Sequence, residues 1–366
     1  MKKLYIIFIV IFLTAIVLPS VWVFATPDKD FSDNENRMLQ TRPGLSGEAL
    51  LSGSFQDKLT SFISDQFPAR DLWTAVGSRV KMLSGMKDIG GAYIGGDGYY
   101  MEMLPDEDID LEKYDSNLGL IKDFALKNPD KPATLLLVPA TGTVLSEKLP
   151  ANAGMYDAAA LYLRARNSLP NVALPDVYSA LLGHADEYIY YRTDHHWTTA
   201  GAKYAYDCLT GGQGAYTGEP ELFSDSFLGT TYSKTLDSSA VADSVYIAPV
   251  SDKLKVTADG KETELYYTAA ANEKDKYKVF FGGNHAQTLI EGGADNGKTL
   301  LVIKDSFANS LVPFLTADYE TIIMLDLRYF NGSVQNIADE MGADELLFVY
   351  EMSGFAGDNN IIKLSF

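Results

Sequence analysis

The stretch TLLVIKDSFANSLVPFL, residues 299–315, decides the fold of this chain. Residues 299–303 form an apolar run that is typical of a strand buried inside a parallel sheet. Asp305 and Ser306 follow directly, and the apolar residues after Phe307 can begin a helix. Strand, tight turn and helix would place the Ser306 hydroxyl at the carboxyl edge of a sheet, where free helix N–H groups can stabilise an oxyanion. The alternative is a plain helix N-cap serine.

A second Asp-Ser-Phe sequence occurs at residues 225–227. It follows the polar, turn-like stretch 220–224, and no apolar strand precedes it. The context therefore favours Ser306 over Ser226 as a nucleophile.

The sequence Asp194-His195-His196-Trp197 supplies partners for such a serine, and it holds two of the four histidines in the chain. Together with Ser306 it provides a hydroxyl, an imidazole base and a carboxylate that orients the base. Residues 188–193 are aromatic and β-branched, which predicts an extended segment in which alternate side chains share a face. Asp194 and His196 would then point one way and His195 the other, with a helix resuming at residue 198 or 199.

Two other interpretations of this motif stay open. His196 can be a structural histidine beside a capping aspartate, and Trp197 can either stack on a sugar ring or pack beneath the loop. A zinc site needs three or four ligands, whereas the other histidines are distant in sequence and Cys208 lies on a predicted helix face. We therefore expect no metal and no cofactor.

Apolar runs alternate with helical segments in the second half of the chain, which predicts an α/β fold. The sheet would be mostly parallel, with helices on both faces. The predicted strands are 134–138, 171–174, 300–303, 321–325 and 346–350. Residues 210–298 interrupt the alternation with an antiparallel β insertion. Its hairpin would pair 253–257 with 263–268 around the turn Asp259-Gly260.

The amino terminus sets the compartment. Lys2 and Lys3 precede the uncharged run 4–24, whose 21 residues would span about 31 Å as a helix, close to a bilayer core. Positive residues before this run predict a cytoplasmic amino terminus and an exported body. Residues 23–25 are similar to a signal-peptidase site, so the protein would be secreted if the segment is cleaved, but its length favours a retained signal anchor.

Composition divides the chain into three predicted parts. Residues 1–26 are the signal anchor or signal peptide, residues 27–105 form an arm with helices and a hairpin, and residues 106–366 form the main domain. The predicted helices of the arm cover residues 55–63 and 72–83, and its hairpin turns at residues 95–98.

Charge and cysteine use exclude several functions. The formal net charge is −19, which disfavours nucleic acid and broad adsorption to anionic lipid, because phosphate binding needs clustered Lys and Arg. A neutral polysaccharide is compatible with this charge. Cys208 is the single cysteine, so no intrachain disulfide can form.

Asp-His-His-Trp followed by a late Asp-Ser-Phe resembles the DHHW protein family of bacterial exported proteins, which is related to the SGNH-hydrolase-like alginate O-acetylation proteins. The stretches 31–37, 62–71 and 92–99 are similar to further motifs of such proteins. The resemblance implies an SGNH-hydrolase-like α/β fold. It also implies a catalytic triad of Asp194, His196 and Ser306, in the order opposite to that of ordinary SGNH hydrolases.

The sequence departs from the pattern at the serine and at the oxyanion hole. Lys304 stands where a glycine usually precedes Asp-Ser. Asn284, after two glycines, is a candidate oxyanion donor, although it precedes Ser306. Arg328 and Tyr329 follow the strand 321–325 and could line the same sheet edge, or serve as a structural ion pair and a core residue.

With the reaction and the substrate class that the resemblance implies, the sequence predicts a membrane-anchored, extracytoplasmic O-acetyltransferase that moves an acetyl group through Ser306 onto a cell-surface polysaccharide. The resemblance implies a membrane-bound O-acyltransferase as the acetyl supplier. Two alternatives use the same chain differently. One is a carbohydrate acetyl esterase with the same triad, and the other is a non-catalytic glycan-binding or scaffold subunit of an exopolysaccharide complex.

Overall fold

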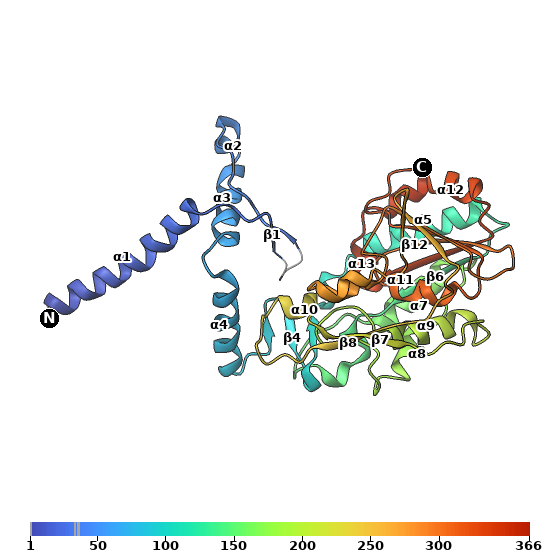
Figure 1. Ribbon diagram of the computed structural model, residues 1–366, viewed down its shortest axis with the longest axis horizontal. Helices are drawn as coiled ribbons and strands as arrows, with labels where there is room; N and C mark the ends of the chain where they lie inside the picture. Colours follow the sequence, from blue (N-terminus) through green and yellow to red (C-terminus); the bar gives the residue numbers. More distant parts are fainter. Residues whose placement is uncertain (1, 33, 35–36) are drawn as a thin grey trace. The chain divides into compact units, whose positions relative to one another are not determined.

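The computed structural model in Figure 1 describes residues 2–32, 34 and 37–366. Asp33, Glu35 and Asn36, which belong to the motif at 31–37, lie outside the described residues. Contacts divide the chain into two units, one of residues up to 86 together with 233–239, the other of 87–232 together with 240–366. The domain boundaries predicted at residues 26 and 105 remain predictions.

The first unit begins with the apolar helix that the sequence predicts. Within the described part of the chain, one helix, residues 3–25, is long and apolar enough to cross a membrane. The elements of this unit are α1 (Lys2–Ala25), β1 (Phe31–Ser32), β2 (Arg37–Met38), α2 (Gly47–Leu51), α3 (Ser54–Asp65) and α4 (Arg70–Leu83). The two helices predicted for the arm are α3 and α4. Phe62 of α3 is fully buried and lies against Phe24, with 5.9 Å between ring centroids.

The second unit is built on a seven-stranded sheet with the order β10-β9-β11-β13-β12-β14-β6. Its strands are β6 (Ala133–Val138), β9 (Lys255–Ala258), β10 (Lys261–Thr263), β11 (Gln287–Glu291), β12 (Thr299–Lys304), β13 (Thr321–Leu325) and β14 (Glu345–Glu351). The four strands β13, β12, β14 and β6 run parallel. The other three pair antiparallel at one side. The predicted mixed α/β fold with a largely parallel sheet is confirmed.

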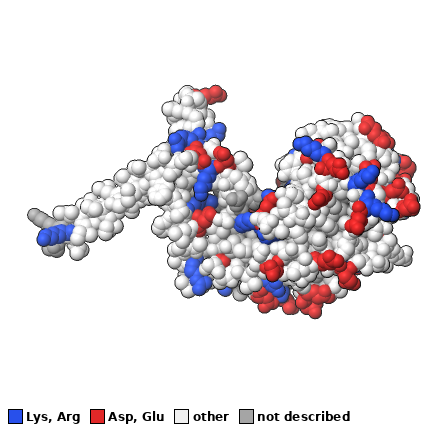
Figure 2. Space-filling view, viewed as in Figure 1, with Lys and Arg blue, Asp and Glu red and all other residues white. Residues whose placement is uncertain are grey.

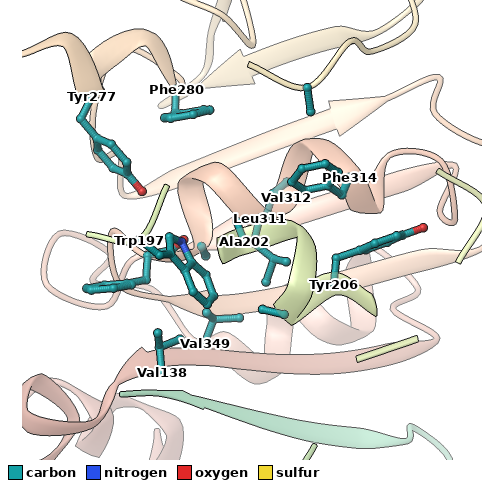
Figure 3. Packing of buried hydrophobic residues seen from close by; sticks show 14 of the residues in the cluster. Val138, Trp197, Ala202, Tyr206, Tyr277, Phe280, Leu311, Val312, Phe314 and Val349 are labelled. Atoms are coloured by element: carbon teal, nitrogen blue, oxygen red, sulfur yellow. The ribbon is translucent and has the colours of Figure 1, made fainter. Parts of the chain in front are cut away.

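Both faces of the sheet are covered because its central strands are apolar throughout. Leu300 and Val302 of β12 belong to one buried cluster, and Leu301 and Ile303 belong to the other, as the period of two requires. The first cluster includes residues of α8 (Val177–Leu182), α9 (Thr199–Thr210) and α11 (Ala308–Leu315), part of which Figure 3 shows. The second includes residues of α5 (Leu111–Lys127), α7 (Ala158–Ser168), α12 (Val334–Glu340) and α13 (Met352–Gly357).

The predicted β insertion extends the same sheet. The turn between β9 and β10 is Asp259-Gly260, and both residues have positive φ (48° and 76°), as a tight hairpin turn requires. The second strand covers Lys261–Thr263 and ends where the predicted strand 263–268 begins, so the predicted bounds of this strand are wrong. Two further strands of the insertion, β7 (Glu221–Phe227) and β8 (Asp243–Ile247), form a separate antiparallel pair.

Two smaller predictions have different outcomes. The hairpin at residues 95–98 is present between β4 (Ala92–Ile94) and β5 (Tyr100–Glu102). The prediction of a strand at 171–174 is wrong. This segment makes one isolated bridge, between Ala173 and Thr134, and does not extend it into a ladder.

Candidate active site

Ser306 lies at the carboxyl edge of the sheet, between β12 and α11. The N–H of Asp305 donates to the carbonyl of Val349 at 3.0 Å, so the ladder continues one residue past the strand. The Asp305 carboxylate then accepts from the N–H of Phe307 at 2.9 Å and the N–H of Glu351 at 2.7 Å. These bonds fix the turn without a left-handed residue at Lys304, which is why the position does not need a glycine.

His196 connects Ser306 to Asp194. Its Nε2 lies 2.8 Å from the Ser306 Oγ, and its Nδ1 lies 2.6 Å from Asp194 Oδ1. The N–H of His196 also donates to Asp194 Oδ1, at 3.0 Å. The structure thus brings the three predicted residues into one hydrogen-bonded chain across 110 residues of sequence.

Thr230 holds the other oxygen of Asp194. Its N–H and its hydroxyl donate to Asp194 Oδ2 at 2.8 and 2.9 Å. The preceding residue must be small, since a Cβ at Gly229 would lie 2.3 Å from the Asp194 Cβ. Sequence reasoning missed both residues, because nothing in residues 227–231 marks them as partners of a carboxylate 36 positions earlier.

The prediction that residues 188–193 are extended, with His195 facing away from His196, is wrong. The segment makes a single bridge, Tyr190 to Trp197, and residues 192–196 form bends. Alternation of side chains therefore does not apply. The two imidazole rings lie together, with centroids 3.9 Å apart, and His195 Nδ1 is 2.7 Å from the Thr230 hydroxyl. The predicted helix does begin at Thr199, with Thr198 as its N-cap.

Burial and neighbouring charges set the protonation states of Asp194 and His196. Desolvation, together with the neighbouring His195, lowers the pKa of His196 from 6.5 to about 4. Burial alone would raise the pKa of Asp194, but the two histidines and the hydrogen bonds from His196 and Thr230 outweigh it and hold that pKa below its usual range. At neutral pH the site therefore contains an ionised carboxylate and a neutral imidazole that can accept a proton.

Tyr277, a second residue that the sequence did not reveal, covers the imidazole. Its ring stacks on His196 with 3.9 Å between centroids and an interplanar angle of 11°. Its hydroxyl donates to the Ser306 carbonyl at 3.0 Å and lies 3.2 Å from the Ser310 Oγ. The ring shields the His196 imidazole from water. The hydroxyl connects the β insertion, to which Tyr277 belongs, to the turn at Ser306.

Of the two interpretations of Trp197, packing beneath the loop is confirmed, and its assignment as a substrate-contacting residue is wrong. The side chain is fully buried, and its Nε1 donates to the Phe307 carbonyl at 3.1 Å and to the Ser310 Oγ at 2.8 Å. Figure 3 shows it close to Ala202 and Val349 in the buried cluster. Its aromatic ring therefore supports the serine turn from below.

The structure separates the other three candidates. Arg328 lines the cavity at Ser306, where Asp326 binds its guanidinium through Nε at 2.8 Å. Tyr329 is 53% exposed and does not line that cavity. Asn284 does not line it either, and its Oδ1 accepts from the buried Lys304 Nζ at 3.0 Å. Neither Tyr329 nor Asn284 is therefore placed to contact a group bound at Ser306.

A cavity of about 520 Å³ opens at Ser306. Four carboxyl groups and one guanidinium are among the side chains that line it: Glu102, Asp305, Glu351, Asp358 and Arg328. Burial raises the pKa of Asp305 to about 6 and also raises that of Glu351. Because four carboxyl groups and one guanidinium line it, the cavity is acidic in composition, and the raised pKa values favour the neutral forms of Asp305 and Glu351.

The motif also offers metal ligands, with one atom each of Asp194, His195 and His196 within 4.8 Å of one another. Both Asp194 oxygens and the His196 Nδ1 already make hydrogen bonds, and the His196 Nε2 faces Ser306. An ion held by these atoms would have to replace the hydrogen bonds that join Asp194, His196 and Ser306. The geometry thus favours proton transfer to His196 over metal binding.

Comparison with known proteins shows similarity in sequence and in fold. The sequence model of the family described as DHHW protein matches residues 147–325. A DHHW family protein from Eubacterium siraeum is 25% identical with a TM-score of 0.63, covering 75% of this chain and 95% of that one. Bacillus cereus PatB1, solved with a sulfonyl adduct, is 22% identical with a TM-score of 0.58, covering 72% and 95%.

A weaker likeness, with a TM-score of 0.48 and 15% identity, links the chain to the O-acetyltransferase domain of Pseudomonas putida AlgJ over 75% of this chain and 98% of that one. No curated protein sequence matches the chain. By sequence over residues 147–325 and by fold over about three quarters of its length, the chain resembles the DHHW proteins, as its motifs predicted.

Proposed function

We propose that the protein is a membrane-anchored O-acetyltransferase that uses Ser306 as its nucleophile and a cell-surface glycan as its acceptor. The observation that carries the proposal is the hydrogen-bonded chain from Ser306 through His196 to Asp194 at the mouth of an acidic cavity. The resemblance to DHHW proteins supports acetyl transfer as the reaction.

In the first half-reaction, Ser306 Oγ bonds to the carbonyl carbon of an acetyl donor while His196 Nε2 takes the hydroxyl proton. The bond to the donor then breaks, and the donor group leaves with the proton from His196. Asp194 stabilises the transient imidazolium through Nδ1. The product of this half-reaction is an acetyl ester on Ser306.

In the second half-reaction, a sugar hydroxyl gives its proton to His196 and attacks the acetyl ester. Collapse releases Ser306, which regains the proton, and leaves the acetyl group on the sugar. The N–H of Phe307 already binds Asp305, so we assign stabilisation of the oxyanion to the N–H of Ser306 and to Arg328.

The acceptor should carry no negative charge near the reacting hydroxyl. The four carboxyl groups that line the cavity would repel a polyuronate, whereas a neutral glycan meets hydrogen-bonding groups without repulsion. Sugar hydroxyls are themselves good partners for carboxylates. We therefore propose an uncharged stretch of polysaccharide as the substrate.

Position in the cell follows from α1. Lys2 and Lys3 precede the uncharged run 4–24 of this helix, which supports a cytoplasmic amino terminus and a body outside the cytoplasm of a bacterial cell. A separate membrane-bound acyltransferase would supply the acetyl group across the bilayer, as the resemblance implies.

The test is acetyl release from a chromogenic acetyl ester by the full chain in detergent, with and without a neutral oligosaccharide. Acetylated oligosaccharide, detected by mass spectrometry, supports the transferase. Ser306-dependent release to water alone, in the presence of acceptor, would identify an esterase. A folded protein that is inert in both assays but binds the glycan would identify a binding subunit.

A further inference from the structure

Helix α4 presents an apolar face outward. Leu72, Trp73, Val76, Val80 and Leu83 are between 46% and 76% exposed. Their spacing places them on one stripe of the helix, because residues three, four or seven positions apart share a face. Within the first unit this stripe is exposed.

The opposite face of α4 is the one that packs. Ser78 is 4% exposed, and Asp71 on the same side accepts a hydrogen bond from the Asn34 Nδ2. The usual arrangement of a surface helix is thus inverted, with polar groups inside and apolar groups outside. Single exposed apolar residues are common, but a contiguous apolar stripe marks a surface that something else covers.

The segment that carries α4 is tied to the end of the membrane-length helix. The rings of Phe24 and Phe62 pack together, the Arg42 Nη2 donates to the Phe24 carbonyl at 3.3 Å, and the Arg42 guanidinium lies over the Phe62 ring. Helix α4 starts five residues after α3 ends. The apolar stripe therefore belongs to the part of the chain that emerges from the bilayer.

Charge points to the same surface. Between Asp65 and Asp88 the chain has four basic residues and one acidic residue, a formal charge of +3 in a chain of −19. In Figure 2, blue and red side chains both occur in the region of α2 to α4, and red ones are frequent on the visible face of the sheet-containing unit. Arg79 lies beside the apolar stripe, next to Leu72 and Leu83 on the helix surface, and Trp73 lies within the stripe. Tryptophan, apolar side chains and flanking basic residues are the composition of a helix at a membrane interface.

We propose that α4 lies in the plane of the bilayer, with its apolar stripe between the headgroups and the acyl chains and with Arg79 near anionic lipid phosphates. The protein would then contact the membrane twice, through α1 and through α4. The second contact restricts the motion of the first unit at the membrane surface. This inference does not depend on acetyl transfer, since it uses neither Ser306 nor the cavity.

The test uses the full chain reconstituted into vesicles of phosphatidylcholine with phosphatidylglycerol. Cys208→Ser removes the single native cysteine, and Val76→Cys and Val80→Cys place nitroxide labels on the stripe. Lys81→Cys is the matched control on the same helix. We expect labels at 76 and 80 to collide often with oxygen and several-fold less often with a water-soluble nickel complex than the label at 81.

Two results would overturn the proposal. Equal access of the nickel complex to all three labels would mean that the stripe faces water. Exclusion of both oxygen and nickel at 76 and 80, with dipolar broadening between labels, would mean that a second copy of the chain covers the stripe.

A second readout does not depend on cysteine variants. In a Trp22→Phe background, lipids brominated near the headgroup should quench Trp73 fluorescence, measured as the difference from Trp22→Phe/Trp73→Phe. Unquenched Trp73 in these vesicles would also contradict the proposal.

Discussion

Two of the three residues at the site depend on a partner outside the motifs that contain them, and the third depends on its neighbour within the motif. Asp194 is fixed by Thr230, His196 by the ring of Tyr277, and the turn at Ser306 by Asp305. A buried carboxylate without donors would take up a proton, and a solvated imidazole would have an ordinary pKa. The surroundings therefore set the charge state that the proposed reaction needs.

Activity should persist at lower pH than for an ordinary histidine base. Burial lowers the pKa of His196 to about 4, and protonation of Nε2 prevents it from accepting the Ser306 proton. The value of kcat/KM for an acetyl ester should fall as pH decreases, with a midpoint near 4. Stability should also fall as the pH decreases. In the unfolded chain His196 binds its proton near pH 6.5, whereas in the folded protein it does so near pH 4, so the free energy of unfolding decreases from about pH 6.5 toward pH 4. An acid limb centred near 6.5 would contradict this assignment.

Thr230→Ala should reduce kcat by roughly 10-fold, because it removes a hydrogen bond to a buried carboxylate and such bonds contribute about 1.5–3 kcal/mol. Thr230→Ser keeps the hydroxyl and should retain most of the activity. Steady-state kinetics of both variants distinguishes the effect of losing the hydroxyl from the effect of losing side-chain volume. Equal loss in the two variants would mean that Thr230 acts by packing alone.

At the scale of elements, the serine turn rests on the loop that carries the histidines. The Trp197 indole joins the start of α9 to the start of α11 through two hydrogen bonds. Trp197→Phe should lower the free energy of unfolding by about 2–4 kcal/mol, from the lost bonds and the smaller ring. Urea unfolding measures this loss. The matched control is the exposed Trp73→Phe, which should change stability in detergent by about 0.5 kcal/mol or less.

Local signals in the sequence predicted elements well where one segment decides the outcome. The strand at 300–303 and the turn at Ser306 follow from an apolar run, a polar turn and a helix start, and the structure contains all three. Thr230 and Tyr277 could not be predicted, because packing of the insertion, and no local pattern, brings them to the motif. The aromatic run 188–193 predicts a strand, but the segment forms a single bridge. Its aromatic residues are selected by tertiary packing in the buried cluster, and not by pairing in a sheet.

At the scale of the whole molecule, the sheet separates two cores, and the carboxyl edge of its parallel strands carries the site. The acidic lining of the cavity gives a prediction about the acceptor. Neutral oligosaccharides should accept acetyl groups several-fold faster than oligouronates of equal length, and Glu102→Gln with Asp358→Asn should narrow the difference. Competition assays with mass spectrometry measure the ratio. A preference for the oligouronate would show that Arg328, and not the carboxyl groups, dominates recognition.

The chain should stay in the membrane fraction at its full mass of 40.1 kDa, because α1 is long enough to remain as an anchor. Cell fractionation followed by intact-mass measurement tests this. A soluble product that begins near residue 26 would show that the segment is a cleaved signal.

The central claim is that Ser306 is the nucleophile, and its most direct measurement compares acetyl-ester turnover by the wild type, Ser306→Ala and Ser226→Ala. Ser226 lies in the second Asp-Ser-Phe sequence, on the strand β7, and controls for loss of a serine in the same sequence context. We predict that Ser306→Ala lowers kcat/KM by roughly 10³-fold or more with folding intact, and that Ser226→Ala has wild-type activity. Undiminished turnover by a folded Ser306→Ala variant would contradict the account.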